Sequence, residues 1–186
     1  MPHNMALVRT RWRPGAHIRG LCGGAPHSST LAGKSMSVTK EEYVHEAQFA
    51  LFGCQLAEAA LKSFLMYARD INALAPAEFA SIRQTDDELE EIPLGGLIKL
   101  GRTAKLDVAI LAQLEELRPL RNHCAHKALL MCFVSDFRKD VDLSVEYARI
   151  LRTRTLAWAS VHAVQSKLDA MSKSLESLRE AERSGT

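Results

Sequence analysis

Apolar side chains recur at intervals of three and four residues along most of this chain, and this helical spacing most limits its fold. The longest such pattern runs from about Asp142 to about Arg179. Its expected core-facing line is Leu151, Thr155, Trp158, Val161, Gln165, Leu168, Met171, Leu175 and Leu178. At about 1.5 Å per residue, the pattern predicts a helix on the order of 55 Å long. Because no segment alternates apolar and polar residues as a strand does, we expect an all-α protein.

A second long helix is predicted from Thr39 to about Asn72. Thr39 and Glu42 have the spacing of a capping box, in which each side chain accepts a backbone N–H bond at the helix start. Two adjacent apolar lines predict a broad core-facing stripe along this helix. They are Phe49, Phe52, Leu56 and Ala60, and Leu51, Cys54, Leu61 and Leu65. Within the stripe, Gly53 would permit close contact with another helix.

Shorter elements are predicted between these two helices. Residues 76–83 fit a short helix that begins with a proline in its first turn. The acidic residues 85–91 are expected to form a solvated loop. Residues 92–100 are expected to form a helix that Gly101 ends.

Asp107 is a suitable N-cap for a further helix that starts at residue 108. Pro119 should kink or break this helix, because proline lacks an N–H and clashes with the preceding turn. Residues 120–133 are expected to continue as a buried helix. Together the elements predict an up-and-down antiparallel four-helix bundle, with a short extra helix and a long C-terminal helix.

The first 36 residues differ in composition from the rest of the chain. Residues 1–35 hold five of the ten glycines, three of the six prolines, five basic residues and no acidic residue. The net charge is +2, so the remainder carries −3, which argues against general binding to phosphate backbones. We expect residues 1–36 to be a disordered extension and residues 37–183 to be one helical domain. The extension has the composition of a transit peptide, or it precedes a natural start at Met36.

The four cysteines form no C-x-x-C pair, which is typical of reduced intracellular thiols. No apolar core of a secretory signal is present in the first residues. The longest uninterrupted apolar run, residues 128–134, is too short to span a membrane. We therefore expect a cytoplasmic chain that does not associate with membranes.

Residues 117–126 place two arginines, two histidines and an asparagine between two apolar segments. If they are helical, Asn122 and His126 lie on one face, and the long Arg121 side chain can reach the same side. An imidazole can take up and return a proton near neutral pH, and a guanidinium can hold a phosphate through two hydrogen bonds. These groups suffice for RNA cleavage in which the ribose 2′-OH attacks the adjacent phosphate without a metal ion.

Spacing alone does not single out these residues. An arginine followed by a histidine, with four to six residues between them, also occurs at Arg118 and His123 and at Arg11 and His17. The residues around Arg121 and His126 distinguish the third match, because a polar Asn follows the arginine and a small Ala precedes the histidine.

Residues 121–126 with this pattern resemble the R-x(4–6)-H motif of HEPN domains (higher eukaryotes and prokaryotes nucleotide-binding). Residues 94–98 and 114–120, which are rich in leucine, resemble the segments that precede the motif. Residues 58–62 resemble the early helix whose polar residue faces the site. The resemblance covers about residues 38–180, and its most specific part is the six-residue motif.

The resemblance implies a four-helix bundle, usually a homodimer whose two motifs face each other across the interface. It implies a metal-independent endoribonuclease with no cofactor, in a toxin, phage-defence or RNA-processing role, with RNA as substrate and an antitoxin or other protein as partner. Arg121 and His126 would be the catalytic pair, Asn122 would support the motif, and Glu58 would orient or neutralise Arg121. The alternative is a member that has lost catalysis and binds RNA, nucleotides or proteins.

Two departures from the HEPN pattern bear on this interpretation. Some HEPN toxins have a tyrosine two residues after the histidine, which a partner antitoxin nucleotidylates, whereas this chain has Ala128 there. Pro119 lies close before the motif, where a continuous helix is expected.

Other interpretations of the same residues, structural roles and a metal site, remain open. Glu58 could lie at the edge of its stripe, in contact with water or paired with Lys62. Arg121 and His126 could form a structural network around carbonyls freed by Pro119. A metal site would have to use His123, Cys124, His126 and Cys132, and adjacent His-Cys residues are poorly placed for this.

Overall fold

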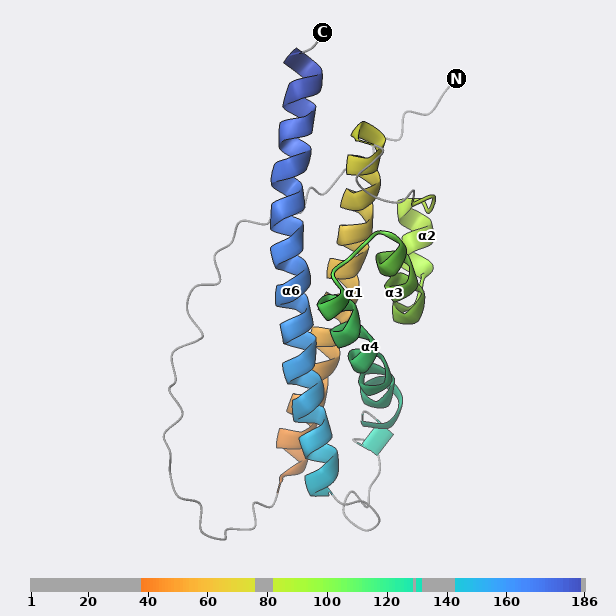
Figure 1. Ribbon diagram of the computed structural model, residues 1–186. Helices are drawn as coiled ribbons and strands as arrows, with labels where there is room; N and C mark the ends of the chain where they lie inside the picture. The colour runs from red at the N-terminus through yellow and green to blue at the C-terminus, as the bar shows by residue number, and fades with distance from the viewer. Residues whose placement is uncertain (1–37, 76–81, 129, 132–142, 185–186) are drawn as a thin grey trace, which may run out of the picture. The chain divides into compact units, whose positions relative to one another are not determined.

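The computed structural model describes residues 38–75, 82–128, 130–131 and 143–184 (Figure 1). The chain divides into Met1–Met36 and Ser37–Thr186, and every described residue belongs to the second unit. These described residues form helices and contain no strand, which confirms the all-α prediction. The predicted disorder of residues 1–36 and most of the predicted helix 76–83 lie outside the described residues.

Helix α1 comprises Lys40–Leu74 and begins with the predicted capping box. The N–H of Glu42 donates to Thr39 Oγ1 at 3.1 Å, and the N–H of Thr39 donates to Glu42 Oε2 at 2.9 Å. Glu41 and Glu42 also place negative charge in the first turn, where the helix dipole favours it. The start of α1 is therefore fixed by local interactions within four residues.

The predicted acidic loop is wrong, because Asp86–Glu91 form a short helix, α2. A second capping box starts it, since Thr85 and Glu88 exchange the same pair of bonds as Thr39 and Glu42. The acidic side chains that suggested a solvated loop instead stabilise the first turn through the helix dipole. Leu89 is buried, and this anchors α2 to the core.

Helix α3, Leu94–Thr103, extends past Gly101, so the predicted end is also wrong. Gly101 lies inside the helix and is buried against leucine side chains. Lys105, two residues after the last helical residue, has a φ of 58°. Bonds from the N–H of Leu106 to the Gly101 carbonyl and from the N–H of Lys105 to the Arg102 carbonyl complete a Schellman motif.

Helix α4, Val108–His123, contains Pro119 without ending there, so the proline does not break the helix. The chain changes its winding five residues later, where Cys124–Ala128 form the π-helical segment η1. Short π-helical segments often occur at functional sites. The expectation of a buried helix to residue 133 holds only in part, because Leu130 is exposed and residues 129 and 132–133 lie outside the described part.

Helix α6, Leu143–Ser184, has 42 residues and is longer than predicted. It runs antiparallel to α4, as shown by the ion pairs Asp107–Lys167, Glu116–Arg152 and His123–Glu146. It runs parallel to α1, as shown by the pairs Glu46–Arg154 and Asp70–Arg179. In Figure 1 both helices rise in the same direction, α1 from orange to yellow and α6 from cyan to blue.

The parallel arrangement of α1 and α6 differs from a strictly alternating four-helix bundle, in which the first and last helices are antiparallel. The unpredicted α2 explains the difference. Pairs between Arg69 and Asp86 and between Lys62 and Glu90 show that α2 runs against α1. Among the described helices, α2 therefore adds a reversal of direction after α1 that the sequence did not predict.

Helices α1 and α6 lie side by side (Figure 1), and small residues meet at part of their contact. A Cβ atom at Gly53 would lie 3.1 Å from the Cβ of Ala157, so the expected role of Gly53 in close helix contact is confirmed. On α6 the buried line in this region is Ile150, Thr153, Ala157, Ser160 and Val164. The predicted line is therefore wrong at Leu151, Thr155, Trp158 and Gln165, whereas Val161 packs against the core and the line holds from Leu168 onward.

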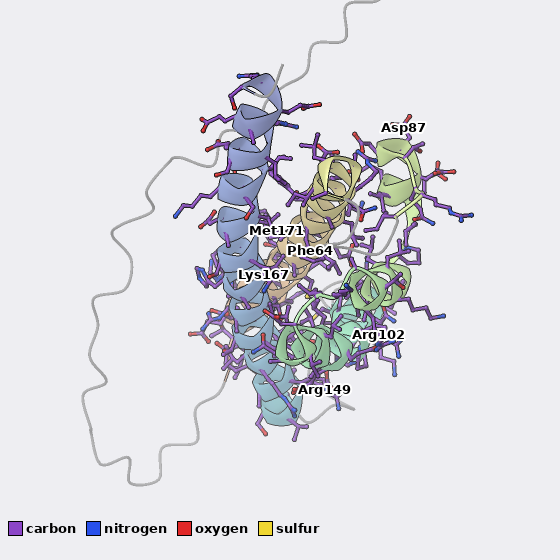
Figure 2. The ribbon with its side chains drawn as sticks, turned by 45° about the horizontal axis from the view of Figure 1, so that its top comes forward. Phe64, Asp87, Arg102, Arg149, Lys167 and Met171 are labelled. Carbon is purple, nitrogen blue, oxygen red and sulfur yellow. The ribbon has the colours of Figure 1, made fainter. Side chains whose placement is uncertain are left out.

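The predicted burial of Phe49 and Phe52 is wrong as well, because these side chains are 45% and 49% exposed. The neighbouring small residues of α1 are buried in their place. Further along, large side chains fill the space between the two helices, as Phe64 and Met171 show in Figure 2. By length and composition α1 could cross a membrane, but the core helices of soluble proteins pass the same test, so this is weak evidence.

Replacing Gly53 with Leu should lower the free energy of unfolding by about 1–3 kcal/mol, because the added atoms cannot fit against Ala157. Urea unfolding followed by circular dichroism measures this change. Gly95→Leu is a matched control, since the nearest atoms there belong to the flexible Arg118 side chain at 3.4 Å. The control should be as stable as the wild type or more stable, because a helical glycine is removed. Equal stability of the two variants would contradict the close helix contact.

Candidate functional site

Arg121 and Glu58 form an ion pair between the last turn of α4 and the middle of α1. The Nε of Arg121 donates to Glu58 Oε1 at 2.8 Å, and the two side chains are only 29% and 17% exposed. Lys62, the alternative partner of Glu58, instead donates to Glu90 at 2.6 Å. The pairing of Glu58 with Arg121 therefore holds in the structure, and the pairing with Lys62 does not.

Two buried thiols, Cys54 and Cys124, lie near this ion pair. Burial, with a smaller effect of the nearby Cys124 and Glu58, raises the pKa of the Cys54 thiol to about 12, against the lowering effect of Arg121. Burial also raises the pKa of the Cys124 thiol, against a hydrogen bond with Thr153. Both thiols are therefore protonated at neutral pH, which makes them poor nucleophiles and poor metal ligands.

An open pocket of about 630 Å³ lies on the other side of the motif. It is lined by Pro119, Leu120, Asn122, His123, His126, Lys127, Arg149 and Arg152. Asn122 and His126 thus face the same pocket, as their four-residue spacing suggested. Arg121 is not among the lining residues, so the structure divides the expected catalytic residues between two surroundings.

His126 is exposed at the pocket and makes no hydrogen bond to any other described residue. It belongs to η1, which begins directly after the last α-helical turn of α4. Among the described residues, none is hydrogen-bonded to either of its ring nitrogens. Lys127 follows it and is also exposed at the pocket.

His123, which the sequence pattern did not single out, is held from two sides by α6. Its Nε2 lies 2.6 Å from Glu146 Oε2, and its Nδ1 lies 3.3 Å from Nη1 of Arg149. A guanidinium can only donate, so Nδ1 must accept and Nε2 must carry the proton that it donates to Glu146. His123 therefore connects α4 to α6, and both of its ring nitrogens have partners on α6.

The two arginines of the pocket come from α6, more than twenty residues after the motif. Arg149 lies near the start of that helix, where Figure 2 labels it, and pairs with Glu146 at 3.3 Å. Arg152 pairs with Glu116 of α4 across the surface. An exposed pair such as Arg152–Glu116 contributes only about 0–1 kcal/mol, so a phosphate could replace Glu116 as the partner of Arg152. The three-residue spacing of Arg149 and Arg152 was the only sequence signal for these residues.

The described residues lend little support to the two other interpretations, a structural network around Pro119 and a metal site. Arg121 donates to Glu58 and not to a carbonyl near Pro119, so a network around the proline is not what holds it. Within the part of the chain that the structure describes, no three His, Cys, Asp or Glu side chains are grouped to hold a metal ion. Of the proposed metal ligands, Cys124 is buried and Cys132 lies outside the described residues.

Chemically, the pocket combines a free imidazole, an amide and three exposed cationic side chains. Such a set can bind a phosphate and move a proton beside it. No protein-family model, curated protein or solved structure was found to match the chain.

The Arg121–Glu58 pair should show a coupling free energy of about 1–2 kcal/mol, because the two charges are largely shielded from water. A double-mutant cycle of Arg121→Gln, Glu58→Gln and the double variant, measured by urea unfolding, gives this value. The exposed pair Arg102–Glu115 is the control, and its coupling should be below about 0.5 kcal/mol. Equal coupling in the two pairs would show that Glu58 does not specifically hold Arg121.

Proposed function

We propose that this chain is a metal-independent endoribonuclease of the HEPN type. The observation that carries the proposal is the pocket in which His126 and Asn122 meet Lys127, Arg149 and Arg152. The finer fold assignment, a HEPN-type four-helix bundle, belongs to the same proposal and rests on the sequence motif.

In the proposed reaction, the ribose 2′-OH attacks the adjacent phosphorus. His126 removes the 2′ proton, the new bond forms between the 2′ oxygen and phosphorus, and the bond to the 5′ oxygen breaks. The proton passes from His126 to the departing 5′ oxygen, and the products carry a 2′,3′-cyclic phosphate and a 5′-OH. This step consumes no water and needs no group that the chain does not supply.

The cationic residues of the pocket would hold the phosphate. Arg149 and Arg152 each carry several N–H donors, and Lys127 lies beside His126. Asn122 would donate its amide hydrogens to a phosphate or sugar oxygen. Charge developing on the phosphate would be stabilised by these fixed donors, which is the usual source of rate acceleration in phosphoryl chemistry.

Arg121, which Glu58 holds in place, also has a role in the proposal. The bond to Glu58 uses one of its five N–H donors, so the two terminal nitrogens can still donate. Glu58 also fixes the charge of Arg121 next to the segment that carries His126. The proposed role of Arg121 is to stabilise the negative charge of the reacting phosphate from a position outside the pocket lining.

The second candidate function is a non-catalytic module that binds RNA or a nucleotide. It is favoured by one observation, the absence of Arg121 from the pocket lining. In that case Arg121 and Glu58 hold α4 to α1, and the pocket binds a phosphate without cleaving it.

Further parts of the proposal follow from the resemblance to HEPN domains. The chain would act in the cytoplasm, as a toxin or phage-defence effector, with an antitoxin or other protein as partner. It would also form a homodimer. Because Ala128 replaces the tyrosine found in some relatives of this type, control by nucleotidylation at that position is not part of the proposal.

The test is cleavage of a mixed-sequence RNA by the full chain in the presence of EDTA. We expect 2′,3′-cyclic phosphate ends, and we expect His126→Ala to lower the rate by roughly 10²–10⁴-fold, as for loss of a general base. His162→Ala is the matched control, because His162 is an exposed histidine of α6 and does not line the pocket. It should cleave at the wild-type rate.

Unchanged cleavage in the His126→Ala variant would rule out the proposed enzyme. If the wild type binds the RNA without cleaving it, and Arg149→Ala with Arg152→Ala weakens that binding, the non-catalytic module is correct. Thermal unfolding of each variant establishes that it remains folded.

A further inference from the structure

Five ring-bearing side chains form a continuous stripe on the surface of α1 and α6. We call it the aromatic stripe, and it consists of His45, Phe49 and Phe52 of α1 with Trp158 and His162 of α6. His45 and Phe49 stack with their centroids 5.9 Å apart. Trp158 lies 6.0 Å from Phe49, 6.4 Å from Phe52 and 6.4 Å from His162. The rings thus form one connected surface.

The stripe is exposed although it is mostly apolar. Phe49 and Phe52 are about half exposed, and both histidines are exposed. Exposed aromatic surface is unfavourable by about 25 cal/mol for each Å² in contact with water. A connected exposed apolar patch with aromatic residues is typical of a surface that binds another macromolecule.

The packing of Trp158 against α1 makes this side chain a rigid centre of the aromatic stripe. Its indole Nε1 and Cδ1 lie 3.5 and 3.6 Å from the position that a Cβ of Gly53 would take. The indole therefore rests against α1 in the space that the missing side chain leaves. Rigid aromatic anchors near the middle of an interface contribute most of the binding free energy.

The charges around the stripe limit what can cover it. No Asp, Glu, Lys or Arg occurs in residues 155–166 of α6 or in residues 47–57 of α1. At the edge, Glu46 and Arg154 neutralise each other within the chain. A nucleic acid would need cations on this face, and an anionic lipid surface would meet Glu41, Glu42 and Glu46 at the start of α1. The face therefore fits neither of these two partners.

A second copy of the same face does fit. In a two-fold contact, residues near the axis meet their own copies, so a charge there would be repelled by itself. The centre of the stripe carries no charge, and its edge offers one acid and one base, so an Arg154 could face a Glu46 of the other copy. The stripe is thus complementary to itself in both polarity and charge.

We propose that two copies of this chain associate through the aromatic stripe. This dimer differs from the one that the HEPN resemblance implies, in which the motifs face each other. Arg149 and Trp158 are nine residues apart on α6, which corresponds to roughly 180° around the helix. The stripe and the pocket therefore lie on opposite sides of α6, and the pocket of each copy stays open to solvent. This proposal does not depend on the proposed function.

Sedimentation velocity of the full chain over a range of concentrations tests the association. The wild type should be a dimer, and Phe52→Glu should be a monomer, because a carboxylate would be buried in the contact without a partner. Phe49→Glu should weaken the dimer in the same way if Phe52→Glu fails to fold. Val108→Glu is the matched control, because Val108 is an 82% exposed apolar residue outside the stripe. It should remain a dimer.

Crosslinking distinguishes the two dimers. In a background with Cys22→Ser and Cys132→Ser, a short bis-maleimide should join two copies of Phe52→Cys and should not join two copies of Lys127→Cys. A wild type that is monomeric up to its solubility limit would overturn the proposal. So would a dimer that survives both glutamate variants, or one that is crosslinked only through position 127 at the pocket.

Discussion

The close approach of α1 and α6 at Gly53 and Ala157 is the contact on which most other features depend. Because small residues meet there, the large aromatic side chains next to them cannot enter the interface. Phe49 and Phe52 are displaced to the surface, and Trp158 rests against the glycine. One backbone contact thus creates both the tightly packed part of the core and the aromatic stripe outside it.

The local parts of this fold were predictable from the sequence, and the packing was not. The capping box at Thr39 and Glu42 involves neighbouring residues, so its pattern was sufficient. The same pattern occurs at Thr85 and Glu88, although the acidic composition of this segment suggested a loop. The buried face of α6 could not be predicted from hydrophobicity, because close helix contact favours Ala157 over the larger neighbouring Trp158.

In the candidate site, too, local spacing was predictable from the sequence and contacts between helices were not. The spacing of Asn122 and His126 predicted that both would face one side, where they line one pocket, and the resemblance to HEPN domains implied the pairing of Glu58 with Arg121. The arginines that line the pocket come from α6, and their position depends on a tertiary contact between helices. The sequence surroundings of His123 do not match the motif, yet this residue joins α4 to Glu146 and Arg149. Its importance depends on which face of α6 it meets, and no short motif contains that information.

The distribution of charge along α6 explains how one helix can serve two surfaces. Its first part carries Glu146, Arg149 and Arg152, which meet α4 and the pocket, whereas residues 155–166 carry no charge. A guanidinium needs an anionic partner or water, whereas an aromatic ring favours an apolar partner. The first part of α6 therefore suits an anionic ligand, and residues 155–166 suit an apolar partner. A ligand at the pocket would replace surface carboxylates, and a partner at the aromatic stripe would remove rings from water. The two events involve different side chains on opposite sides of a rigid helix, so occupation of one surface leaves the other accessible.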